Sequence, residues 1–109
     1  MFRVFVGLTL CMGLAATAAA QDAKVARGEK LFAEQKCAVC HSIGGKGNKK
    51  GPLDAVGSKL KNDEVREWIV DAKGMTAKTK ASRKPEMKVY HLPKEDVEAL
   101  AAYLMTLKK

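Results

Sequence analysis

The sequence predicts a small all-α fold of about three to five helices. Apolar residues recur at helical spacing, with charged residues between them, in the stretches 22–36, 62–74 and 93–109. No segment shows a convincing strand pattern, and no internal repeat is present. The chain has 109 residues, which limits it to one domain at most.

The first predicted helix, 22–36, contains Gly28, which costs about 1 kcal/mol relative to alanine inside a helix. We expect this glycine to mark the close approach of another helix. A loop rich in Gly and Lys follows at 42–53, and 55–60 is expected to form one short helical turn. A Gly-Lys-Ser/Thr phosphate-binding signature is not present in this loop.

The next helix is expected to begin with Asn62 as its N-cap and to stop at Gly74. The segment 75–91 is expected to be extended, because Pro85 would break a helix. Pro93 suits the first position of the last helix, and the C-terminal lysines suit its negative dipole end.

Residues 1–20 carry the pattern of a secretory signal peptide, with Arg3, an apolar run at Val4–Leu14 and small residues at Ala18–Ala20. A retained membrane anchor is the alternative, but the apolar run is shorter than the about 20 residues that a spanning helix needs. We expect cleavage after the last of these alanines and export to the periplasm. The mature domain would be residues 21–109, with no stable membrane span.

The chain is basic, with 20 Lys+Arg against 12 Asp+Glu and a formal net charge of +8. A basic exported protein is expected to meet an acidic partner surface or an anionic membrane. Nucleic acid is another common partner of basic chains, but the export signal and the lack of interleaved aromatic residues argue against it. We therefore expect a monomer that binds other proteins.

The most specific motif is Cys37-Ala38-Val39-Cys40-His41, the pattern of a c-type haem attachment site. On a helical turn, residues three apart share one face, so both thiols can bond to the vinyl groups of one porphyrin. The histidine that follows can supply an axial nitrogen to the iron. The motif predicts one covalent haem c on Cys37 and Cys40, with His41 as an iron ligand.

Two other interpretations of these cysteines are weaker. A zinc site could combine them with His41 and His91, but adjacent Cys40 and His41 can hardly reach one tetrahedral ion. A thioredoxin-type dithiol needs a strand–helix context that the sequence does not show.

The order of the motifs resembles the class I cytochrome c family, the small monohaem electron carriers. The resemblance covers essentially all of 21–109 and rests on four motifs: Gly28-x-x-x-Phe32, Cys37-x-x-Cys40-His41, Gly51-Pro52-Leu53 and Leu100-x-x-Tyr103-Leu104. It implies helices wrapped around one covalent haem, with the first and last helices crossing. Gly28 would lie at that crossing, with Phe32, Leu100 and Tyr103 beside it.

The family also supplies a methionine as second axial ligand, and Met75, Met87 and Met105 are available. Met87 stands at the expected distance before Tyr103, although Lys88 follows it where the family usually has proline. The alternative ligand is His91.

The resemblance further implies four neighbours of the haem. The carbonyl of Pro52 would accept a hydrogen bond from His41. Trp68 would pack near the haem edge, where a plain core position is equally expected, and Leu100 and Leu104 would pack on the haem.

The implied function is one-electron transfer between larger redox proteins, without catalysis. The alternatives are a haem-based sensor or small peroxidase with a labile methionine, or a cytochrome subunit of a dehydrogenase or oxidase complex. Basic residues in the two segments that would flank the haem edge are expected to steer docking onto acidic partners, or else only to solubilise the protein: Lys46, Lys49, Lys50, Lys78, Lys80, Arg83, Lys84 and Lys88.

Overall fold

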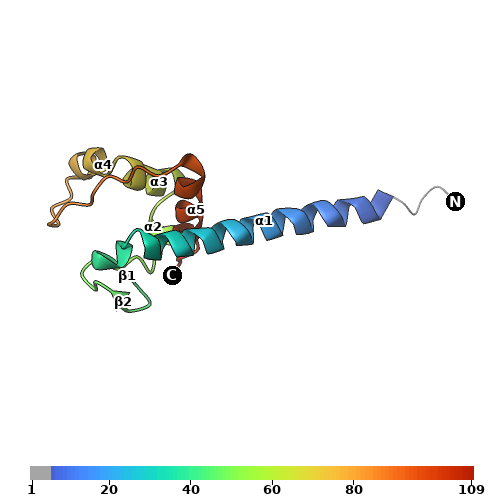
Figure 1. Ribbon diagram of the computed structural model, residues 1–109, viewed down its shortest axis with the longest axis horizontal. Helices are drawn as coiled ribbons and strands as arrows, with labels where there is room; N and C mark the ends of the chain where they lie inside the picture. Colours follow the sequence, from blue (N-terminus) through green and yellow to red (C-terminus); the bar gives the residue numbers. More distant parts are fainter. Residues whose placement is uncertain (1–5) are drawn as a thin grey trace.

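The computed structural model describes the backbone of residues 6–109 and the side chains of residues 17–109. Arg3 and the start of the predicted signal peptide lie outside these residues. In order, the elements are α1 (Val6–Glu34), the 3-10 turn η1 (Cys37–Val39), β1 (Ser42–Ile43), β2 (Lys46–Gly47), α2 (Val56–Lys59), α3 (Asn62–Val70), α4 (Ala72–Thr79) and α5 (Lys94–Met105). The predicted all-α class is confirmed (Figure 1).

Helix α1 is longer than the sequence pattern predicts. It runs without a break for 29 residues from Val6, instead of starting near Asp22, and its first half projects from the globular part as a rod (Figure 1). The reason is local, because Ala and Leu are strong helix formers and make up eight of the 15 residues from Val6 to Ala20. None of the helices in the described residues is long and apolar enough to cross a membrane. Cleavage after Ala20 stays a prediction.

The C-terminal part of α1 crosses α5 at Gly28, as predicted. A Cβ atom on Gly28 would meet the carbonyl oxygen of Ala99 and would lie 2.6 Å from Cβ of Tyr103. Beside this point the rings of Phe32 and Tyr103 meet edge to face, with centroids 6.1 Å apart. Glycine is therefore placed here because the two backbones approach too closely for a side chain.

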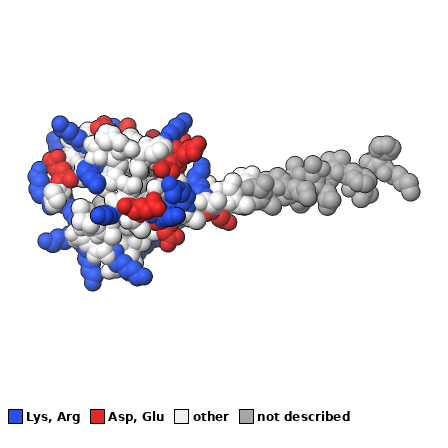
Figure 2. All heavy atoms as spheres, in the orientation of Figure 1, with Lys and Arg blue, Asp and Glu red and all other residues white. Residues whose placement is uncertain are grey.

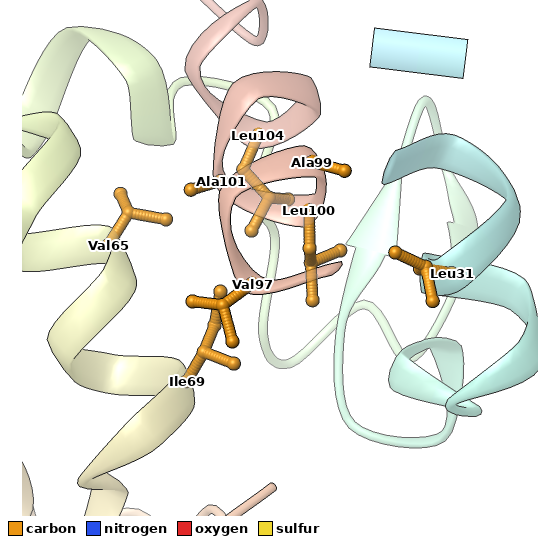
Figure 3. Close-up of a cluster of buried hydrophobic side chains, with 8 residues drawn as sticks. All are labelled: Leu31, Val65, Ile69, Val97, Ala99, Leu100, Ala101 and Leu104. Carbon is orange, nitrogen blue, oxygen red and sulfur yellow. The ribbon is translucent and has the colours of Figure 1, made fainter. Parts of the chain in front are cut away.

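The hydrophobic core is built around α5 (Figure 3). Leu100 and Leu104 are only 3% and 8% exposed, and they pack with Leu31 from α1 and with Val65 and Ile69 from α3. The two leucines predicted to pack on a haem thus belong to the same core that joins the helices.

The predicted helix over 62–74 is wrong in its boundaries. Lys61, and not Asn62, is the N-cap, and its N–H donates to Oε1 of Glu64 at 3.0 Å. The helix breaks at Asp71, whose carboxylate accepts a hydrogen bond from the N–H of Gly74 at 3.1 Å and so caps α4. Gly74 therefore lies inside a second helix instead of ending the first, because a capping carboxylate starts a new helix here.

Two smaller differences concern the connections. The segment 75–91 is extended only after α4 ends at Thr79, and Pro93 is the N-cap of α5 rather than its first helical residue. The loop after the cysteine motif contains a short antiparallel hairpin, β1 with β2, which the sequence pattern did not predict. Its turn is formed by Gly44 and Gly45, both at positive φ, as tight hairpins require.

Replacing Gly28 by alanine is expected to destabilise the haem-loaded protein by about 2 kcal/mol. Overpacking a tight contact costs about 1–3 kcal/mol, which outweighs the gain of about 1 kcal/mol that alanine brings to a helix. The measurement is the free energy of unfolding in guanidinium chloride. The control is Ala26→Gly on the exposed face of α1, which should lose only the helix propensity. A more stable Gly28→Ala protein would contradict the close crossing.

Candidate functional site

The cysteine motif occupies a tight turn directly after α1. Lys36 has a left-handed backbone with φ of 57°, which turns the chain out of the helix. The N–H groups of Cys40 and His41 then both donate to the carbonyl of Cys37, at 3.1 and 2.9 Å. Both cysteines of the motif are free and half-buried. The turn therefore presents two unpaired thiols immediately before a histidine, which is the donor set that covalent haem attachment needs.

His41 is held by Gly51, and not by Pro52 as the family resemblance implies. Nδ1 of His41 lies 3.1 Å from the carbonyl oxygen of Gly51. That oxygen also accepts from the N–H of Ser42 at 3.0 Å, while the N–H of Leu53 donates to Ser42. Ser42 and Pro52 thus pair as a parallel bridge. Because successive carbonyls of an extended segment point to opposite sides, Gly51 faces the motif and Pro52 faces away.

This hydrogen bond selects which nitrogen of His41 can bind a metal. With Nδ1–H donating to a backbone carbonyl, Nε2 carries the free lone pair. Burial lowers the pKa of His41, and the nearby Arg83 adds to this, although the bond to Gly51 acts in the opposite direction. The neutral imidazole is therefore favoured, which is the form that ligates metals.

The thiol of Cys37 contacts Tyr90, from a segment far along the chain. Burial raises the pKa of Cys37, opposed by a hydrogen bond from the Tyr90 hydroxyl. Burial also raises the pKa of Tyr90 to about 12, so the phenol stays protonated. Reactive dithiols have a lowered cysteine pKa. The raised pKa of Cys37 therefore disfavours the thioredoxin-type interpretation.

The connection that carries Met87 lies against the cysteine motif. A Cβ atom on Gly51 would sit 2.9 Å from Cζ of Arg83, so this guanidinium packs directly on the chain that holds His41. Three residues beyond Met87, Tyr90 contacts Cys37. Met87 itself is half-buried. The predicted iron ligand Met87 thus lies in a segment that contacts Gly51 before this residue and Cys37 after it.

The other candidate ligands are placed differently. Met75 is buried in α4, and Met105 packs against the core from α5. His91 is exposed, and no group of three or more His, Cys, Asp or Glu in the described part of the chain could hold a metal ion. The zinc site with His91 is therefore not assembled. Trp68 is half-buried on α3 and lies outside the core shown in Figure 3.

Sequence reasoning missed Asn48, which holds the turn of the motif together. Its backbone N–H lies 3.0 Å from the carbonyl oxygen of Ala38 and 3.1 Å from that of His41. Its side-chain Nδ2 donates to the carbonyl of Val39 at 3.1 Å. The signal was an asparagine after a glycine in a tight loop, since asparagine commonly bonds backbone groups there.

Comparison with known proteins gives one family and one relative. Residues 25–108 match the family model described as Cytochrome c. Cytochrome c oxidase subunit 2 of Alkalihalophilus pseudofirmus is 31% identical over 91 residues, which cover 75% of this chain and 25% of that protein. The chain therefore spans about a quarter of this relative's length. No solved structure matches the chain.

Replacing Gly47 by alanine is expected to cost about 3 kcal/mol of stability. Its φ is 104°, and a Cβ atom would meet the carbonyl of His41 and lie 3.1 Å from that of Ala38. Backbone strain and overpacking each contribute about 1–3 kcal/mol. Gly45→Ala is the matched control, because its φ is also positive but nothing lies within 4 Å of its Cβ position. Equal losses in the two unfolding free energies would show that the contact with the motif is unimportant.

Proposed function

Because the chain belongs to the class I cytochrome c family, we propose that it is a monomeric one-electron carrier with histidine and methionine as iron ligands. Membership makes it a haem-based electron-transfer protein, and the family implies covalently bound haem c. The axial ligands His41 and Met87 and the role of a carrier between larger redox proteins are our proposal.

One observation carries the proposal. His41 follows two free cysteines and is bonded through Nδ1 to Gly51, which leaves Nε2 available, and the segment with Met87 lies against the same turn. The residues present therefore fit a haem c. Cys37 and Cys40 would hold it by thioether bonds, and His41 and Met87 would ligate its iron.

When bound, haem c supplies an iron that gains and loses one electron. The residues of this chain determine how that iron is used. The Gly51 carbonyl fixes the ring of His41 and raises its basicity. A thioether from Met87 favours the reduced state and raises the potential. If His41 and Met87 both ligate the iron, no open position would remain there for a substrate, so we propose that the protein is not an enzyme.

We further propose that residues 1–20 direct export and are removed, and that the mature protein works in the periplasm. This follows from the charge, apolar run and small residues at the start of the sequence. Haem would be attached to the exported chain.

The proposed carrier would use its basic surface to meet acidic redox partners. Figure 2 shows Lys and Arg around most of the rim of the globular part, with fewer Asp and Glu between them. All eight basic residues of the segments 42–53 and 75–91 are exposed: Lys46, Lys49, Lys50, Lys78, Lys80, Arg83, Lys84 and Lys88. A surface on which one sign of charge predominates raises association rates with oppositely charged partners.

A second candidate function is that of a cytochrome component of an oxidase complex. The observation that favours it is the similarity to Cytochrome c oxidase subunit 2 of Alkalihalophilus pseudofirmus. Purification without detergent separates the two functions. A carrier is recovered alone and reduced by a redox partner in solution, whereas a complex component is recovered with oxidase subunits.

The covalent haem is tested by intact mass and by the visible spectrum of protein made in an exporting host that attaches haem c. We expect a mass that corresponds to residues 21–109 plus one haem, and a weak far-red band from the iron–methionine bond in the ferric state. Met87→Ala should lose this band and let the ferrous protein bind carbon monoxide.

Met75→Ala is the matched control, since it removes a thioether from α4 and should keep the far-red band. Loss of the band in Met75→Ala but not in Met87→Ala would assign the ligand to Met75. Carbon monoxide binding by the unaltered protein would favour the sensor or peroxidase function instead, and a chain without covalent haem would contradict the whole proposal.

Docking is tested by the rate of electron transfer to an acidic redox protein at increasing salt. We expect the rate to fall steeply as ionic strength rises, because charges are screened beyond about 10 Å at 0.1 M salt. Lys50→Glu in the loop should slow transfer by about threefold or more at low salt, while Lys24→Glu on the exposed face of α1 should not. If the electron-transfer rate does not depend on salt, the lysines only solubilise the protein and do not steer docking.

A further inference from the structure

We infer that Arg83 and Tyr90 are positioning residues that hold the Met87 segment against the haem-attachment turn. The segment 83–90 acts as a strap, fixed at one end on Gly51 and at the other on Cys37. This inference rests on the proposed ligation by Met87. It gives Tyr90 a role and gives Arg83 one that is separate from docking.

The first anchor is the guanidinium of Arg83. A Cβ atom on Gly51 would contact Nη1 of Arg83 and would lie 2.9 Å from its Cζ, so the guanidinium packs against a position that has no side chain. The Gly51 carbonyl is the same group that accepts from His41. Arg83 therefore holds the strap against the side of the site that carries His41, the proximal side.

The second anchor is Tyr90, which is held on three sides. Its backbone N–H donates to the carbonyl of Ile69 at the end of α3, at 3.2 Å. Its hydroxyl lies close to the sulfur of Cys37, and Nζ of Lys88 lies 4.9 Å from its ring centroid. A thioether sulfur is still a weak hydrogen-bond acceptor, so this contact is compatible with a covalently bound haem.

Met87 lies between the two anchors and differs from its neighbours. Its side chain is half-buried, while Glu86 and Lys88 are exposed. Fixing both ends of so short a segment leaves its backbone few conformations, which lowers the entropy lost when the thioether binds iron. Proline after the methionine would restrict the backbone in the same way. Here Lys88 occupies that position, and the contacts of Arg83 and Tyr90 restrict the backbone of the strap instead.

The test measures how readily imidazole displaces Met87 in the ferric, haem-loaded protein, alongside the far-red band and the reduction potential. Arg83→Ala and Tyr90→Phe should each bind imidazole about tenfold more tightly, the size expected from one lost contact of a charged or buried group. Both should also weaken the far-red band and lower the reduction potential. Arg83→Lys should bind imidazole almost as tightly as Arg83→Ala, because lysine lacks the guanidinium group that contacts Gly51.

Lys84→Ala is the matched control, since Lys84 is exposed and pairs only with Glu86 among the contacts described here. It should bind imidazole like the unaltered protein. Tyr90→Phe keeps the ring, so it tests the hydroxyl even if Arg83→Ala folds poorly. Imidazole affinity unchanged in Tyr90→Phe and Arg83→Ala would overturn the strap while leaving Met87 as ligand. Absence of the far-red band from the unaltered protein would overturn the ligation itself, and the strap with it.

Discussion

The contact on which this structure depends is the crossing of α1 and α5 at Gly28. It sets the position of both helices, since the backbone of α1 lies against Ala99 and the side chain of Tyr103. Leu31, three residues on, enters the core from the same side of α1. The cysteine turn begins directly after the end of this helix. The packing contact at Gly28, nine residues before Cys37, therefore sets the orientation of the thiols that are proposed to bind haem.

Beyond that crossing, the site is held chiefly by backbone groups. Asn48 bonds three carbonyls of the cysteine turn, and Gly51 holds both His41 and Ser42. Two loops with little regular structure are thus made rigid by hydrogen bonds rather than by a large core. A chain of this size buries a modest apolar area. Hydrogen bonds that order the loops therefore add stability that the core alone would not supply.

Much of this was predictable, because the informative signals are local. The cysteine motif, the helix crossing at Gly28 and the edge contact of Phe32 with Tyr103 all follow from spacing or from the family resemblance. The break at Asp71 was not predictable, since the same carboxylate can be an exposed helical residue or an N-cap, and tertiary packing decides between them. The sequence also cannot tell which of two adjacent carbonyls, Gly51 or Pro52, faces His41, because that depends on the register of a long-range bridge.

The bond between His41 and the Gly51 carbonyl has a consequence for how such a protein can change over time. The acceptor is a main-chain oxygen, so no amino-acid substitution can remove it. A substitution at Gly51 can only change the position of this oxygen. The acceptor that orients His41 is therefore protected against point mutation, although the imidazole that it orients is not. The proposed distal side would depend on the side chains of Met87, Arg83 and Tyr90 alone, each of which one codon change can replace. Variation in redox properties among descendants of this chain would accordingly be concentrated on one side of the haem.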